Sequence, residues 1–297
     1  MSSPPPSFSH PGPAPLHPEL PDGIERTPGP SEPPRGLAAV PIWAPFAAMF
    51  AVFLVAGFVA ALIGGVVSAT GTEVSAEDTP PGVLISAAVV QFAATVAFAI
   101  LFARNWAGPV RAATFGVRRT PWLRALGWTA LTYLAFGICA LIYSAIVGPG
   151  PQQDLVDDLK DERSLVVLVG FALMVGVLAP IAEELFFRGF LFGVLRERIG
   201  AGWGAAIAGT VFGLVHVAGT PVRTLGILVV LGVGLCLLYQ KTGSLLPGMA
   251  LHAVNNAVAL GATKELRWWL FILVVLGSAA LVLAAMTAVV AREQRTA

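Results

Sequence analysis

The chain has 297 residues, a formal net charge of +1 at pH 7, 56% apolar residues and only 12% charged residues. An ordinary soluble domain carries roughly 25% charged residues, so this composition excludes a purely water-soluble globular protein. It indicates an all-α integral membrane protein, because apolar stretches cross a bilayer as helices of about 20 residues.

The first segment, residues 1–36, is rich in proline. It holds twelve of the 23 prolines and shows no hydrophobic periodicity. Such a segment cannot bury enough apolar surface to fold, so we expect a disordered cytoplasmic tail. It also lacks the basic start and apolar core of a signal peptide.

Eight apolar spans follow the tail and predict a polytopic helix bundle. We expect transmembrane helices at 41–69, 82–103, 125–147, 164–195, 203–218, 223–240, 244–262 and 267–291. The first three lie in residues 37–163, and the other five form a second part at 164–291. Residues 292–297 are then a short cytoplasmic tail.

Charges in the loops predict the orientation of the bundle. The 104–124 loop carries five arginines and no acid, whereas the 70–81 and 148–163 loops are rich in acids. The positive-inside rule places the arginine loop and both termini in the cytoplasm. Arginine far outnumbers lysine, and Ala, Val and Gly abound, which is associated with GC-rich bacterial genomes. We therefore expect a multi-pass protein of a bacterial inner membrane.

Small residues recur four apart in the second part of the chain. Gly189/Gly193 and Gly209/Gly213 are such pairs, and they predict close helix packing. No internal repeat is evident, so the inverted-repeat architecture of many transporters has no support.

Polar and ionisable side chains inside a bilayer are costly and mark functional sites. Here they gather in three of the predicted spans. The candidate site residues are Glu183, Glu184 and Arg188 in the fourth span, His216 at the end of the fifth, and His252 and Asn256 in the seventh.

Helical spacing assigns partners within this set. Glu184 and Arg188 are four residues apart, about 40° around an α-helix, with the acid in the favourable N-terminal position for an ion pair. Glu183 lies about 100° from Glu184, on another face. We infer that Arg188 neutralises Glu184 and leaves Glu183 free to face a cavity. His252 and Asn256, again four apart, share one face.

The depths of these groups also agree. At 1.5 Å per residue, Glu183 and His216 each lie about 20 Å from the cytoplasmic ends of their spans, and His252 about 12 Å. A single glutamate–arginine pair can be a structural staple, and a single histidine a satisfied core residue. Convergence of unpaired polar groups at one depth favours a functional cavity open to the cytoplasm.

At these residues the sequence resembles the CPBP family, the type II CAAX prenyl endopeptidases, also called Rce1-like or Abi membrane proteases. That family has Glu-Glu-x-x-x-Arg, Phe-x-x-x-His and His-x-x-x-Asn motifs, in that order, on three membrane helices. The motifs here read Glu183-Glu184-Leu-Phe-Phe-Arg188, Phe212-Gly-Leu-Val-His216 and His252-Ala-Val-Asn255-Asn256. The resemblance covers roughly residues 165–260.

The resemblance implies endoproteolysis within the membrane. Glu183 would be the general base that activates a water together with His216, and His252 and Asn256 would stabilise the oxyanion. Glu184 and Arg188 would orient the site.

Participation of a metal stays open at this stage. Zinc would suit Glu183, His216 and His252 as three ligands plus a water, and the same residues serve equally well without metal. The His-Glu-x-x-His signature of other zinc proteases is absent, as are a Gly-x-Ser-x-Gly elbow and an aspartate within a span.

Two other functions remain as alternatives. In a proton-coupled transporter, Glu183, His216 and His252 would form a proton relay. A catalytically idle scaffold or immunity protein of the same fold would keep the motifs without cleaving anything. For the peptidase, we expect a membrane-associated peptide or protein as substrate, contact with the lipid bilayer and no nucleic-acid partner. Whether that substrate is prenylated stays open.

Overall fold

The computed structural model describes residues 36–69, 80–148, 163–263 and 266–296. All of them belong to one compact unit spanning residues 34–297. Every regular element in the described residues is a helix, which confirms the predicted all-α class. The Pro-rich tail up to residue 35 and most of the two acidic loops lie outside the described residues.

Six helical segments of the described chain are long and apolar enough to cross a membrane, so the protein is a multi-pass membrane protein. These segments are α1 (Ala44–Ala69), α2 (Pro81–Ala107), α3 (Trp122–Val147), a continuous run over Leu165–Leu214, α8 (Val222–Thr242) and most of α10 (Trp268–Thr296). The long run consists of α5 (Leu165–Leu173), η3 (Met174–Leu178), α6 (Ala179–Glu183), η4 (Glu184–Phe192) and α7 (Gly193–Leu214).

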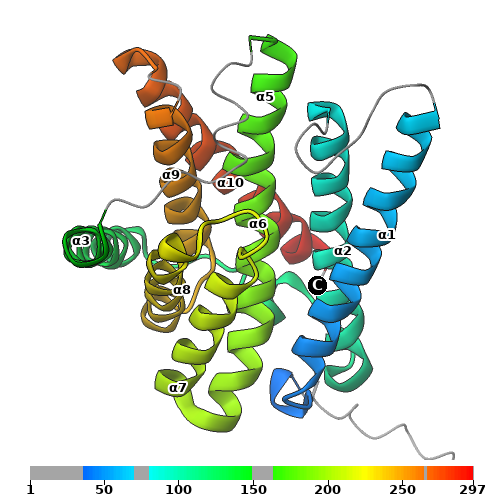
Figure 1. Cartoon of the computed structure of the whole chain (residues 1–297). Helices are drawn as coiled ribbons and strands as arrows, with labels where there is room; N and C mark the ends of the chain where they lie inside the picture. Colours follow the sequence, from blue (N-terminus) through cyan, green and yellow to red (C-terminus); the bar gives the residue numbers. More distant parts are fainter. Residues whose placement is uncertain (1–35, 70–79, 149–162, 264–265, 297) are drawn as a thin grey trace, which may run out of the picture. The chain divides into compact units, whose positions relative to one another are not determined.

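Each of the eight predicted spans has a helical counterpart. The run Leu165–Leu214 reverses at Gly200, whose φ of 80° is left-handed, and its two arms lie antiparallel (Figure 1). These arms correspond to the predicted spans 164–195 and 203–218. The predicted span 244–262 is α9 (Leu246–Thr263), an 18-residue helix that is not among the six. The count of eight crossings therefore remains a prediction.

The helices surround a central column formed by α5, η3, α6 and η4 (Figure 1). α1 and α2 form a hairpin, and α2 contacts α6 and η4. α7 packs along α8, and α9 packs along α10. The core between them is rich in phenylalanine, with Phe190 in edge-to-face contact with both Phe115 and Phe186. Two short 3-10 helices, η1 (Leu37–Ala39) and η2 (Ala112–Phe115), close one end.

η3 and η4 are π-helical, a departure from the regular α-helix assumed for the fourth span. The proline at position 180 gives the physical reason for the first of them. Proline lacks an N–H and its ring clashes with the carbonyl four residues earlier, so a preceding α-helix must widen. In η3 the Ala179 N–H donates to the Met174 carbonyl, one residue further back than in an α-helix.

The glycine pairs allow close backbone approach, as the sequence predicts. A Cβ atom on Gly209 would lie 2.6 Å from the Val233 backbone nitrogen, and one on Gly232 would lie 2.8 Å from Gly209 Cα. α7 and α8 therefore touch backbone to backbone. The other pair packs against the short helices instead, Gly189 against Phe115 of η2 and Gly193 against Leu37 of η1.

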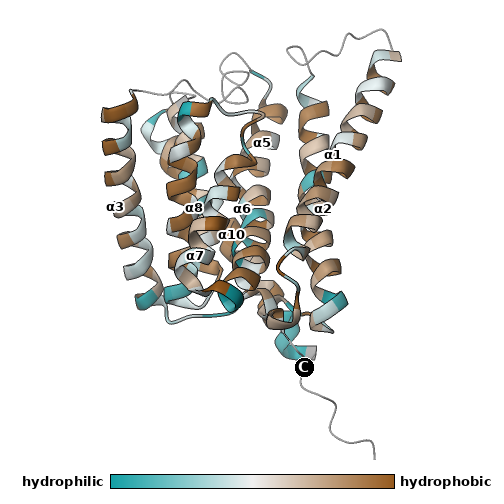
Figure 2. Cartoon of the chain, turned by 60° about the horizontal axis from the view of Figure 1, so that its bottom comes forward, coloured by the Kyte–Doolittle hydropathy of each residue, from teal (hydrophilic) through white to brown (hydrophobic). Residues whose placement is uncertain are grey.

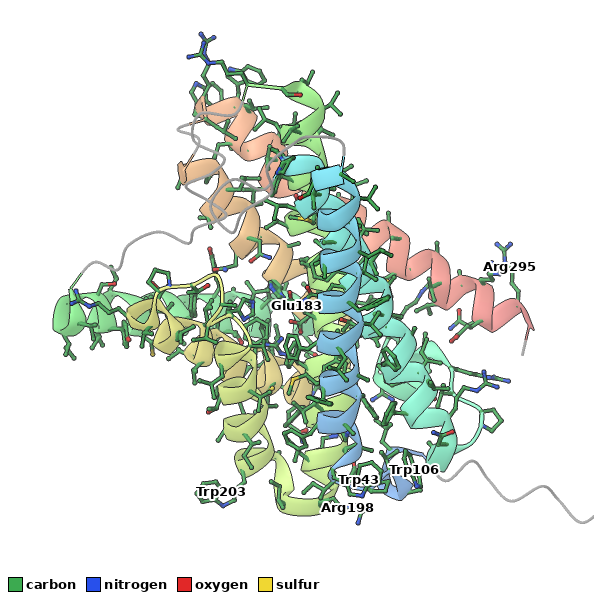
Figure 3. The ribbon with its side chains drawn as sticks, turned by 45° about the vertical axis from the view of Figure 1, so that its right-hand side comes forward. Trp43, Trp106, Glu183, Arg198, Trp203 and Arg295 are labelled. Atoms are coloured by element: carbon green, nitrogen blue, oxygen red, sulfur yellow. The ribbon has the colours of Figure 1, made fainter. Side chains whose placement is uncertain are left out.

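One end of the bundle gathers the segments predicted to be cytoplasmic. Arg118 and Arg124 of the arginine loop donate to the carbonyls of Gly243 and Lys241. Arg198 donates to the Ala38 carbonyl in η1 and to the Val40 carbonyl just after it. Hydrophilic residues concentrate at the helix ends, while the flanks are apolar (Figure 2). Trp43, Trp106, Arg198 and Trp203 lie together at this end (Figure 3), as tryptophan does at membrane interfaces.

Candidate active site

The predicted site residues come from three helical elements and the turn that follows α7. Figure 3 shows one of them, Glu183, near the middle of the bundle and well away from the tryptophan-rich end. Glu183 is the last residue of α6, Glu184 and Arg188 lie in η4, and His252 lies in α9. His216 differs from its prediction. A helix was predicted over the whole span 203–218, but α7 ends at Leu214. His216 therefore lies in the turn that follows the helix.

Glu184 and Arg188 form a buried ion pair, as their spacing predicts. Arg188 Nη1 lies 2.9 Å from Glu184 Oε1, and the two side chains are 0% and 1% exposed. Arg188 Nη2 also donates to the Gly232 carbonyl of α8 at 3.3 Å. The guanidinium carbon stands 4.3 Å from the Phe212 ring centroid, a cation–π contact. The arginine thus ties η4 to α7 and α8.

His252 connects the two adjacent glutamates. Its Nδ1 lies 3.0 Å from Glu184 Oε1, and its Nε2 lies 3.7 Å from Glu183 Oε2. Because the carboxylate of Glu184 is paired with Arg188 and can only accept, we assign the Nδ1 proton of His252 as the donor. The Nε2 edge then points toward Glu183, too far for a direct hydrogen bond.

His216 is held by its own helix end. Its Nδ1 lies 2.7 Å from the Phe212 carbonyl oxygen, which can only accept, so Nδ1 carries the proton. In the neutral ring Nε2 is then an acceptor and a base. The Phe212 ring lies 5.0 Å from the His216 ring and 5.7 Å from the His252 ring, measured between centroids. Phe212 therefore links all three motifs.

Asn256 is engaged with the column rather than with the other site residues. Its Nδ2 donates to the Val175 carbonyl of η3 at 3.0 Å. Val175 needs this donor, because the Ala179 N–H is used by Met174 and the next residue, Pro180, has no N–H. One amide hydrogen of Asn256 fills this gap, and the second is left for another acceptor.

A cavity of about 190 Å³ borders the site. Glu183 and His216 both line it, and Glu183 retains 17% side-chain exposure against 1% for Glu184. His252 and Asn256 do not line this cavity, although His252 lies against Glu183. The structure thus brings Glu183 and His216 to one cavity, as expected, and leaves Asn256 at its own contact on η3.

Among the described residues, no three or more His, Cys, Asp or Glu side chains are grouped so as to hold a metal ion. The Nδ1 atoms of His216 and His252 hydrogen-bond to protein oxygens, so Nε2 is the remaining nitrogen of each ring.

Several lining residues were not identified from the sequence. The remaining residues that line the cavity are Met49, Val52, Phe53, Gln91, Phe92, Thr95, Phe186, Phe187 and Val215. Gln91 offered the same signal as the histidines, a polar side chain within an apolar span. The apolar residues offered no signal, because every span is rich in them.

Comparisons with known proteins bear on the central part of the chain. No curated protein and no solved structure matches it. Residues 165–258, which contain all three motifs, match the family model described as type II CAAX prenyl endopeptidase Rce1-like. The family recognised from the motifs is therefore confirmed over this segment, which matches the Rce1-like family model.

Proposed function

We propose that the protein is an intramembrane endopeptidase that hydrolyses a peptide bond of a membrane-associated peptide or protein. Glu183 is the general base, and it acts with His216 on a water molecule in the cavity that both residues line. The water oxygen attacks the carbonyl carbon of the scissile bond, and its proton passes to Glu183.

The negative charge that develops on the substrate oxygen needs donors. His252 supplies one through Nε2 when that nitrogen is protonated, and Glu184 holds the ring in place through Nδ1. The second amide hydrogen of Asn256 supplies another. Each such donor is commonly worth about 3 kcal/mol of transition-state stabilisation. When the carbon–nitrogen bond breaks, Glu183 returns its proton to the leaving amine.

The observation that carries the proposal is the contrast between two adjacent glutamates. Glu184 is fully buried and neutralised by Arg188, whereas Glu183 has no arginine or lysine partner among the described residues and borders a cavity beside a histidine. A merely structural role would require only the buried pair. A carboxylate kept beside a cavity within the bundle is costly, and catalysis is the use that fits it.

The family description suggests a prenylated Cys-a-a-X protein as substrate, cleaved before its last three residues. Processing of other membrane proteins or peptides in a bacterial inner membrane is the broader class. Comparative mapping of N- and C-terminal peptides from membranes with active or Glu183→Ala protein tests the proposal. New termini confined to the active protein are expected, and identical peptide sets would contradict it.

A further inference from the structure

The cavity has two walls of different origin. Glu183, Phe186, Phe187, Val215 and His216 lie in the segment matched by the family model. The other six lining residues, three from α1 and three from α2, precede that segment. Features of the second wall can therefore differ from those of other family members while the motifs stay the same.

Seven of the eleven lining residues are apolar, and the second wall contributes four of these. Its two polar residues are Gln91 and Thr95. The Thr95 hydroxyl donates to the Gln91 main-chain carbonyl at 2.8 Å, so the threonine is satisfied within its own helix. The half-buried Gln91 side-chain amide, in contrast, makes no hydrogen bond with any other described residue and lines the same cavity as Glu183.

An unbonded amide in the middle of a membrane helix is costly unless something occupies the cavity beside it. A glutamine amide carries both an N–H donor and a C=O acceptor, the same two groups that a peptide unit presents. A main-chain amide of an extended substrate segment can pair with both. Apolar side chains of that segment would then contact Met49, Phe53 and Phe92.

We infer that Gln91 is a substrate-positioning residue, which binds a main-chain amide of an apolar, extended peptide and holds its scissile bond beside Glu183. Binding of the peptide by Gln91 does not depend on the proposed function. Only the placement of a scissile bond beside Glu183 rests on it. Gln91 touches the substrate but not the reacting atoms, so it contributes to binding more than to the chemical step.

The test measures peptide binding by full-length protein in lipid nanodiscs, in a Glu183→Gln background that prevents turnover. The probe is the tightest binder from a pool of capped nine-residue peptides built from Ala, Val, Leu and Phe. Gln91→Met keeps side-chain length and removes the amide, and Thr95→Val is the matched control one helical turn away. We expect Gln91→Met to raise the Kd about five- to tenfold and Thr95→Val to leave it within about twofold.

Backbone methylation of the probe identifies the group that Gln91 binds. At one position of the probe, N-methylation of the peptide N–H should weaken binding to protein with Gln91 about as much as the Gln91→Met substitution does. The same N-methylation should not weaken binding to Gln91→Met protein any further. Unchanged thermal unfolding of Gln91→Met in detergent would separate this result from a folding defect.

Equal affinity of the Gln91 and Gln91→Met proteins for the probe would overturn the inference, as would no binding by any peptide of the pool. An equal loss on Thr95→Val would do the same, because it would indicate a general change of the wall. The proposed catalysis fails separately, if Glu183→Gln protein still cleaves the probe. In active protein, the inference predicts a raised KM with a largely retained kcat for Gln91→Met.

Discussion

At the scale of single residues, Glu183 and Glu184 show how one step along a helix changes the environment of a carboxylate. Glu184 has a cation at 2.9 Å and a histidine at 3.0 Å, and solvent does not reach it. Glu183 keeps a 3.7 Å contact with the other nitrogen of that histidine and borders the cavity. The same side chain is thus a structural anchor at one position and an accessible base at the next.

This contrast predicts opposite outcomes for two isosteric substitutions. Glu184→Gln leaves Arg188 buried without its counter-charge, which should lower the free energy of unfolding by about 3–5 kcal/mol. Glu183→Gln removes no buried ion pair with arginine and should leave thermal unfolding in detergent near normal, while peptide cleavage is lost. Equal losses of stability would contradict the assignment of Arg188 to Glu184, and undiminished cleavage by Glu183→Gln would remove the general base.

At the scale of elements, the π-helical segment before Pro180 explains the position of Asn256. The widened turn leaves the Val175 carbonyl without a helical donor, and the Asn256 amide on α9 supplies one at 3.0 Å. α9 is thereby fixed against the column that carries Glu183. Asn256 contributes to the alignment of two helices as well as to any contact with substrate.

A double-mutant cycle tests this structural role. Asn256→Ala should cost about 1 kcal/mol of stability, because a carbonyl within the bundle loses its donor. In a Pro180→Ala background residue 180 regains an N–H, which can donate to Val175, so the same Asn256→Ala change should cost clearly less. Thermal unfolding in detergent of the four proteins gives the coupling. Equal costs in both backgrounds would contradict the link between Asn256 and Pro180.

The contact of α7 with α8 supports the site from the other side. Gly232 lies against Gly209 and offers its carbonyl to Arg188, so the spacing of the two helices sets the position of the arginine. Gly209→Ala would place a Cβ 2.6 Å from the Val233 backbone nitrogen, which cannot move aside alone. We expect a loss of about 1–3 kcal/mol.

Gly277→Ala in α10 is the matched control for that substitution, because a Cβ there meets nothing within 4 Å. It should leave the melting temperature unchanged or slightly raised, since alanine favours helix more than glycine does. If both variants melt alike in detergent, the close approach of α7 and α8 does not limit stability.

Hydropathy predicted the existence of the helices well, because about 20 apolar residues have few alternatives in a bilayer. The ion pair of Glu184 and Arg188 followed from local spacing alone. The π-helical register did not, since it results from a proline acting on the turn before it. The contribution of α1 and α2 to the cavity could not be predicted either, because it depends on contacts between segments that are far apart in the sequence.

At the scale of the whole molecule, contacts at one end of the bundle tie together segments that are distant in sequence. The Ala112 N–H donates to Glu293 of α10, and the Leu245 N–H donates to the Gly116 carbonyl. The arginine loop, the residue before α9 and the end of α10 therefore lie at one end of the bundle. The loop charges predict the same grouping of these segments, but the hydrogen bonds indicate it independently of those charges.

Reporter insertions test which side of the membrane this end faces. Five arginines in the 104–124 loop predict a cytoplasmic location, because positively charged loops are retained on that side. A reporter after Arg119 and one after Arg295 should both be cytoplasmic. One near Asp157, in the acidic segment outside the described residues, should face the opposite side.

Alkaline phosphatase is active only outside the cytoplasm. Green fluorescent protein fluoresces only in the cytoplasm, because it does not fluoresce after export by the general secretion route. Paired fusions therefore give a positive signal for either location. The reverse pattern would contradict the predicted N-inside orientation, and different sides for Arg119 and Arg295 would contradict the hydrogen bonds that join their segments.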